Sequence, residues 1–161
     1  MSAKERKSAA KHRHKQIACA TRGGTASRAT EDEAIALALE QDAALTFLYI
    51  VDAHFAAGLS GKLTLETVED ELRHIGELIL EQAIARAKKK GIAASGVIRE
   101  GRVAEEIEGF VAEQKDLDTL VVGHMSDELR EHLEPVLHQV TRRRVDVVVV
   151  RSDGARRFTL G

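Results

Sequence analysis

Short apolar runs alternate along the chain with longer stretches in which apolar residues recur every three or four positions. The runs predict strands at residues 16–21, 44–51, 92–99, 117–123 and 145–151. The run at 44–51 is apolar or aromatic almost throughout, which is typical of a strand covered by helices on both faces. Between the runs, the pattern predicts helices that start after Thr30 and cover 65–90, 103–113 and 136–142.

Local signals mark the helix ends. Thr30 followed by Glu33 fits a capping box, so the first helix is predicted to begin at Thr30. In the long helix, one inward face is predicted from the positions Leu65, Val68, Leu72, Ile75, Ile79 and Ala83. In the third helix, Ile107, Phe110 and Val111 are predicted to point inward. Regular alternation of strands and helices implies βαβ crossovers, and therefore one open parallel sheet with helices on both faces.

The charges are distributed unevenly. The first fifteen residues hold six of the 24 Lys and Arg but only one of the 26 Asp and Glu, so they predict a solvated, disordered basic arm. The other residues hold 18 basic and 25 acidic side chains. Such an acidic body, with 3% aromatic residues, disfavours specific nucleic-acid binding. We therefore expect three parts: the arm at 1–15, an α/β domain at 16–152 and a polar tail at 153–161.

Composition excludes several classes of protein. No stretch approaches the roughly 20 apolar residues of a membrane span, so a cytoplasmic protein is expected. The only cysteine, Cys19, lies between small residues in the first strand, where a thiol behaves as a buried apolar group. Because the chain has a single cysteine, an intramolecular disulfide is excluded. The seven histidines lack the spacing of a helical metal pair, so no metal site is expected.

Five segments, in this order, resemble the universal stress protein family: residues 17–23, 48–52, 101–107, 118–123 and 147–151. The resemblance covers residues 16–152. It implies a five-stranded parallel sheet of order 3-2-1-4-5, similar to the adenine nucleotide alpha hydrolases, and a homodimer. One branch of that family binds ATP and another does not.

The ATP-binding branch has an aspartate just after the first strand and the pattern G-x2-G-x9-G-[ST] after the fourth. Here Arg22 stands in place of the aspartate, and only Gly123 matches the loop. The other three loop positions are Ser126, Val136 and Leu137. Four carboxylates, at Asp127, Glu128, Glu131 and Glu134, would repel a triphosphate. Ser126 is instead predicted to cap an extra helical turn, with Pro135 in the first turn of the next helix.

The first functional hypothesis is therefore a non-enzymatic, dimeric stress-response or regulatory protein that acts through an unidentified protein partner and has no cofactor. ATP is possible but disfavoured. The second hypothesis is an atypical nucleotide- or small-anion-binding module in the crevice where ligands bind in such sheets. Its candidate residues are Arg22, Gly23, Gly24, Val51, Gly123, His124 and Ser126. A third hypothesis, a nucleotide hydrolase, needs a metal-binding carboxylate and a positioned base, and the only carboxylates near the loop are the crowded set from Asp127 to Glu134.

The last strand has four successive valines, from Val147 to Val150. If this strand is outermost, its exposed edge needs a cover. Pairing with the same strand of a second copy would supply one, which agrees with the homodimer that the resemblance implies. Val147, Val148, Val149 and Val150 are therefore the predicted dimer interface.

Overall fold

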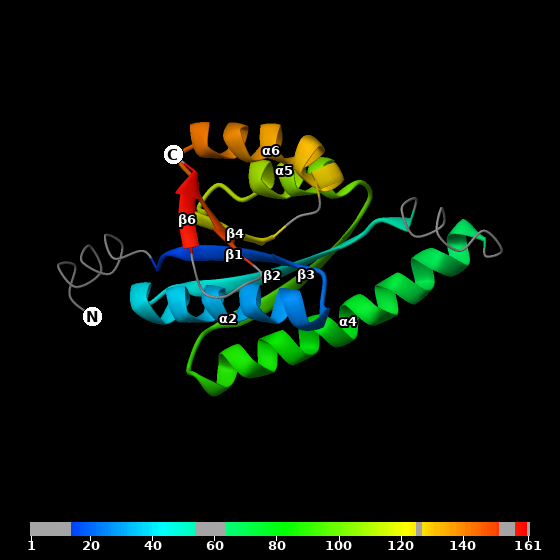
Figure 1. Ribbon diagram of the computed structural model, residues 1–161. Coiled ribbons are helices and arrows are strands. Elements are labelled where there is room, and N and C mark those ends of the chain that lie inside the picture. The colour runs from blue at the N-terminus through cyan, green and yellow to red at the C-terminus, as the bar shows by residue number, and fades with distance from the viewer. Residues whose placement is uncertain (1–13, 54–63, 125–126, 152–156, 161) are drawn as a thin grey trace.

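The computed structural model describes residues 14–53, 64–124, 127–151 and 157–160, which are coloured in Figure 1. The strands are β1 (Gln16–Thr21), β2 (Ala44–Val51), β3 (Ala94–Glu100), β4 (Thr119–Gly123), β5 (Asp146–Val150) and β6 (Arg157–Leu160). The helices are α2 (Gly24–Gln41), α4 (Leu65–Lys89), α5 (Val103–Glu113) and α6 (Asp127–Arg142). Up to β5, strands and helices alternate as the hydrophobic pattern predicts. The predicted basic arm falls almost wholly outside the described residues.

The strands form one sheet in the order β3-β2-β1-β4-β5-β6. Strands β1 to β5 pair in parallel, so the predicted parallel sheet of order 3-2-1-4-5 is confirmed. Thr21 lies opposite Tyr49, and Cys19 lies opposite Val121. This register brings the carboxyl ends of β1, β2 and β4 to one edge of the sheet, where the strand order reverses.

Strand β6 was not predicted. It runs antiparallel to β5, with Val147 opposite Leu160 and Val150 opposite Arg157. The prediction of a polar tail over 153–161 is therefore wrong for residues 157–160, and β5 is not the outermost strand. A strand of the same chain pairs with the backbone edge of β5 that would otherwise be open. The predicted dimer interface at Val147–Val150 thus loses the open edge on which it was based.

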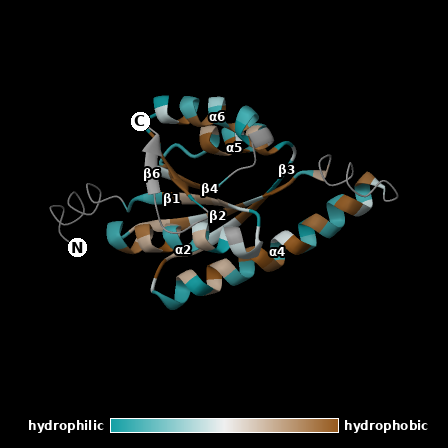
Figure 2. Cartoon of the chain, in the orientation of Figure 1, coloured by the Kyte–Doolittle hydropathy of each residue, from teal (hydrophilic) through white to brown (hydrophobic). Residues whose placement is uncertain are grey.

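Of the helices in the described ranges, two cover each face of the sheet. Helices α2 and α4 lie on one face and α5 and α6 on the other, with their apolar sides turned toward the strands (Figures 1 and 2). Because successive strand residues point to opposite faces, Ile17 and Cys19 belong to the core under α2 and α4. Ala18 belongs to the second core, together with Ile107 and Phe110 of α5. The predicted inward residues of α5 are thereby confirmed.

Helix α2 begins earlier than predicted. Gly23 is its N-cap, and Gly23 and Gly24 both have a φ of +79°, a conformation that glycine adopts without strain. The expected capping box is wrong, because Thr30 lies inside the helix and is buried, 2% exposed. Its hydroxyl instead packs beside Gly123 at the end of β4. The glycine pair lets the chain turn directly from β1 into the helix.

Helix α6 is one continuous helix from Asp127, so the predicted division before Pro135 is also wrong. Pro135 is exposed, and its ring therefore faces away from the sheet. The buried face is built from Leu133, Leu137 and Val140, with Leu129 partly buried. Their spacing of three and four residues is that of one helix face. The predicted cap, Ser126, lies outside the described residues.

Helix α4 has the predicted boundaries. The Thr64 hydroxyl oxygen caps its start by accepting a hydrogen bond from the Thr67 N–H at 3.2 Å. Its buried residues are Val68, Gly76, Leu80, Ala83 and Ala87. The predicted inward face is wrong for Leu65 and Ile75, which are 40% and 45% exposed. Leu65 is the first residue of the helix, and Ile75 lies outside the buried face that Gly76, Leu80 and Ala83 form, so the predicted face extended too far around the helix.

Gly76 provides the first testable prediction. A Cβ atom at this position would lie 2.4 Å from Cδ1 of the buried Tyr49 ring. We expect Gly76→Ala to lower the free energy of unfolding by about 1–3 kcal/mol through overpacking. Alanine's helix preference of about 1 kcal/mol opposes this loss but is smaller. Urea unfolding measures the change.

Gly109 in α5 offers a matched control. A Cβ atom there would lie 3.0 Å from Nη2 of Arg99, the end of a flexible side chain that can move. Gly109→Ala should therefore leave stability unchanged or raise it by up to about 1 kcal/mol. Equal destabilisation by both variants would contradict close packing of α4 on Tyr49.

Candidate functional site

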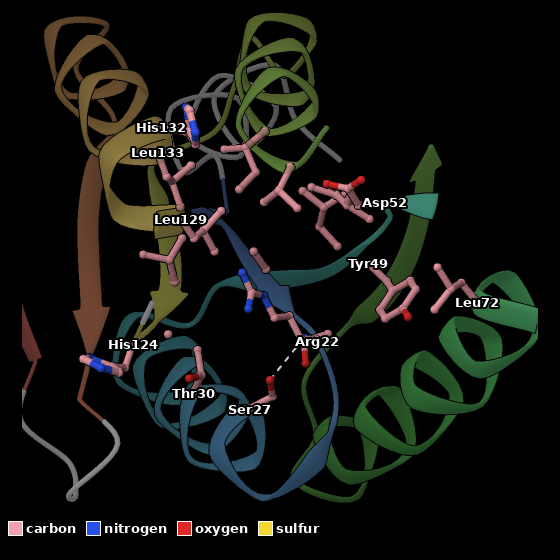
Figure 3. Close-up of a pocket in the computed structure, with 18 residues that line it drawn as sticks. Arg22, Ser27, Thr30, Tyr49, Asp52, Leu72, His124, Leu129, His132 and Leu133 are labelled. Carbon is pink, nitrogen blue, oxygen red and sulfur yellow. Dashed lines mark hydrogen bonds between the residues drawn. The ribbon is translucent and has the colours of Figure 1, made fainter. Parts of the chain in front are cut away.

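A cavity of about 360 Å³ opens at the carboxyl ends of β1, β2 and β4. Residues from both helical layers complete its wall: Leu72 of α4, Val103 and Ile107 of α5, and Leu129, His132 and Leu133 of α6. The strands contribute further apolar groups, among them Leu48, Ile50 and Val122. The lining is mostly apolar and carries a few polar side chains (Figure 3). This combination is typical of a small-molecule site.

Arg22 and Asp52 are the charged groups of this lining, apart from its histidines. Arg22 directly follows β1 and points into the cavity in Figure 3, and Asp52 directly follows β2. Desolvation of the guanidinium lowers the pKa of Arg22, and the Asp52 carboxylate opposes that shift. The cavity therefore holds one guanidinium whose positive charge the Asp52 carboxylate partly balances.

The turn after β1 is fixed by its own hydrogen bonds. The Arg22 N–H donates to Oγ of Ser27 at 3.1 Å, and the Gly23 N–H donates to Oγ1 of Thr21 at 3.2 Å. Both Thr21 and Ser27 line the cavity. Two backbone donors of this turn are thus already used within it.

Gly123 forms part of the cavity wall at the end of β4. A Cβ atom at this position would lie 2.6 Å from Oγ1 of Thr30. Glycine is therefore required for the close approach of α2 to β4. His124 follows Gly123 and also lines the cavity as an exposed side chain.

The predicted site residues fall into separate places. Arg22, Gly123 and His124 come together in the cavity as predicted. Gly23 and Gly24 line a second hollow, which Arg28, Glu31 and Arg86 also line. Val51 is 1% exposed and belongs to the core under α2 and α4 rather than to the cavity lining. Ser126 lies outside the described residues.

Sequence reasoning missed several cavity residues. Asp52 had a usable signal, since it follows a strand whose end lies at the same sheet edge. Tyr49 and Thr30 had none, because their position depends on the packing of α4 and α2 against the sheet. Leu129, His132 and Leu133 share one face of α6, a pattern that became visible only once the helix was known to start at Asp127.

The segment predicted to repel a triphosphate is arranged differently from that prediction. Glu131 and Glu134 are exposed residues of α6 and do not line the cavity. Val136 and Leu137 lie in the same helix, and Leu137 is 0% exposed. The side chains of Asp127 and Glu128 are not described. Glu131 and Glu134 therefore do not place carboxylates at the cavity wall, as the repulsion of a triphosphate there would require.

Cys19 is confirmed as a core residue. Its side chain is 0% exposed, and burial is the main cause that raises the pKa of the thiol far above its usual value. Within the described ranges, no three His, Cys, Asp or Glu side chains are grouped so that they could hold a metal ion. The helices of the described ranges include none that is long and apolar enough to cross a membrane.

A sequence model of the universal stress protein family matches residues 13–156. The chain belongs to this family. A universal stress protein of Methanocaldococcus jannaschii is 31% identical to it over 110 residues, which are 68% of this chain and 64% of that protein. This universal stress protein thus spans less than two thirds of the length of that curated relative.

Solved structures share the fold of this universal stress protein. UspA from Lactobacillus plantarum is 20% identical, with a TM-score of 0.66 over 85% of this chain and 97% of that one. A universal stress protein in complex with cAMP is 23% identical, with a TM-score of 0.62 over 86% and 98% of the two chains. Other similar structures are an Archaeoglobus fulgidus protein with dAMP and an Arabidopsis thaliana protein with AMP bound.

Proposed function

We propose that this universal stress protein is a cytoplasmic, non-enzymatic regulator that acts as a homodimer through contacts with another protein. We further propose that its ATP site is degenerate and that its cavity binds an adenine nucleoside monophosphate. The observation that carries the proposal is the cavity itself, which has a mostly apolar wall and one arginine. The segment that would form the triphosphate-binding loop is part of helix α6 instead.

The size and lining of the cavity support a nucleoside ligand. Its volume of about 360 Å³ lies within the usual range of small-molecule sites, roughly 300–1,000 Å³. Apolar side chains surround the space that a base and ribose would need, and Arg22 can donate charge-assisted hydrogen bonds to one phosphate. Solved structures with this fold carry cAMP, dAMP or AMP, which makes this ligand class the first to test.

A triphosphate is disfavoured by backbone geometry. The third glycine and the hydroxyl of the ATP-binding pattern correspond to Val136 and Leu137, which lie in the interior of α6. In a helix interior, the N–H groups donate to carbonyls four residues earlier, so they are not available to cradle phosphates. Of the positions of that pattern that the structure describes, Gly123 is the one that lies in the cavity wall.

A binding role is favoured over catalysis by the state of the reactive groups. Among the described residues, neither His124 nor His132 has a hydrogen-bonding partner that would orient it as a general base. Cys19 is buried, and its raised pKa keeps it protonated. The small-anion alternative at Arg22 to Gly24 has less support, because two backbone donors of this turn are already engaged.

Calorimetric titration with AMP and with Mg-ATP tests the proposal. We expect AMP to bind at least about tenfold more tightly than Mg-ATP. Arg22→Gln should weaken AMP binding by about tenfold through the loss of one charge-assisted contact. Arg28→Gln is the matched control, because Arg28 lies in the second hollow and should not affect AMP.

Two results would contradict the proposed ligand. Mg-ATP that binds more tightly than AMP would show that a triphosphate site persists despite α6. AMP binding that Arg28→Gln weakens as much as Arg22→Gln would place the ligand outside the cavity.

A further inference from the structure

The outer side of α4 carries apolar residues that no described element covers. Ile75 is 45% exposed and Leu78 is 49% exposed. With four other exposed residues of the same helix they form a row that we name the outer stripe: Glu71, Ile75, Leu78, Gln82, Ala85 and Lys89. Helix α4 forms the lower margin of the molecule in Figure 1, so this side is open.

The spacing of the outer stripe is that of a helix-pairing seam. Its members follow one another at intervals of 4, 3, 4, 3 and 4 residues, the spacing of a heptad seam, and the three at Ile75, Leu78 and Ala85 are apolar. The buried residues Gly76, Leu80 and Ala83 belong to a different stripe that faces the sheet. With 25 residues, α4 is about 37 Å long and offers several turns for such a contact.

Charge is divided along α4. Residues 65–81 include six carboxylates, at Glu66, Glu69, Asp70, Glu71, Glu77 and Glu81, against the single basic residue Arg73. The end of the helix has the opposite charge, with Arg86, Lys88 and Lys89 and no carboxylate after Glu81. Two parallel copies of α4 would place like charges together, whereas two antiparallel copies would place the acidic part of each against the basic part of the other.

We propose that the outer stripe of α4 binds the outer stripe of a second copy of this chain, in an antiparallel pair around a two-fold axis. Glu71 then lies next to Lys89 of the other copy. In the layers between them, Ile75 meets Ala85 and Leu78 meets Gln82, so that a large side chain always faces a smaller or flexible one. Because the axis is two-fold, each contact occurs twice.

This inference rests on the homodimer in the proposed function and gives it a surface. The sheet edge offers a weaker alternative, since β6 already pairs with β5. Pairing of two copies through β5 would require β6 to leave that strand. The exposed apolar residues of α4 are accessible without any rearrangement. The second copy is therefore favoured at the helix rather than at Val147–Val150.

Sedimentation velocity of the full chain over a concentration series tests the inference. We expect a dimer that Leu78→Glu weakens by at least about a hundredfold in Kd, because a buried leucine contact is lost twice. Leu39→Glu is the matched control: Leu39 on α2 is also 49% exposed but lies outside the stripe, and this variant should remain dimeric. Circular dichroism of both variants checks that they fold.

Charge reversal tests the antiparallel arrangement. Lys89→Glu should weaken the dimer by about tenfold or more, and Glu71→Lys combined with Lys89→Glu should restore it. Lys88→Glu, on another side of the helix, should have a smaller effect. A monomer at every concentration would overturn both the homodimer and this surface. A dimer unaffected by Leu78→Glu would overturn only the surface and place the contact elsewhere.

Discussion

The double variant Val136→Gly/Leu137→Ser is expected to lose about 5 kcal/mol of unfolding free energy and to gain no affinity for Mg-ATP. It installs the two residues that the ATP-binding pattern would have at these positions. In this chain they lie inside α6, and Leu137 is fully buried in the core with Phe110 and Val140. Serine leaves a cavity and buries a hydroxyl, and glycine weakens the helix. Because small domains have about 5–15 kcal/mol in total, much of the protein should unfold.

A control within the same helix separates the two causes. His138→Gly/Gln139→Ser introduces the same residue types at exposed neighbouring positions of α6. It should cost only about 1–2 kcal/mol, chiefly from glycine in a helix. Urea unfolding measures the stability of both variants. Each variant that remains folded is then titrated with Mg-ATP in the calorimeter. A folded Val136→Gly/Leu137→Ser variant that binds Mg-ATP tightly would show that α6 can convert into a phosphate loop, against our proposal.

Removal of Arg86 should give the second-largest effect, and one that depends on pH. The Glu31 side chain is 5% exposed, and its Oε1 lies 3.5 Å from Nη1 of Arg86. Oγ1 of Thr21 donates to its other oxygen at 3.3 Å. Burial raises the pKa of Glu31, and Arg86 opposes that rise. At pH 7.5, Arg86→Met should therefore lower the unfolding free energy by about 2–3 kcal/mol, because it leaves a buried carboxylate without its cation.

The sign of the pH dependence follows from the raised pKa. A carboxyl whose pKa is higher in the folded state favours folding most below its ordinary value of 4.5, and this contribution is lost as pH rises through the folded pKa. The loss caused by Arg86→Met should accordingly shrink as the pH is lowered toward 4.5. Urea unfolding at several pH values measures it, and Glu31→Gln in the same chain should remove most of the dependence.

A surface ion pair provides the comparison. Arg73 contacts Asp70 at 3.1 Å and also contacts Glu100, but these carboxylates are 70% and 46% exposed. Arg73→Met should therefore cost less than about 1 kcal/mol. An equal cost for Arg73→Met and Arg86→Met at pH 7.5 would contradict the role of burial at Glu31.

The sheet could be predicted because its strands are buried on both faces and therefore appear as continuous apolar runs. The errors occurred where a local signal had two meanings. Thr30 and Glu33 have the spacing of a capping box, yet the flexible pair Gly23–Gly24 allows the helix to start earlier. Pro135 resembles a helix start, but its exposed position lets α6 continue through it. Strand β6 has only four residues, and its pairing with β5 is a tertiary contact.

The site could be predicted only where it depends on strand ends. Arg22, Gly123 and His124 follow directly from the rule that ligands bind beyond the carboxyl ends of parallel strands. Gly23 and Gly24 were also predicted to line the cavity, but they line the second hollow instead. They follow Arg22 directly in the turn, and there the chain already runs toward α4. Val51 was misplaced because its side chain is packed into the core under α2 and α4, where it is 1% exposed.

The position of Tyr49 has a spectroscopic consequence. The chain has one tyrosine and no tryptophan, and this tyrosine lies in the wall of the cavity against Gly76 of α4. Its ultraviolet emission therefore comes from a single known place. Ligand entry, movement of α4 and unfolding would each change the surroundings of that one ring. The protein thus carries a built-in fluorescent reporter at its candidate site, and no label has to be attached.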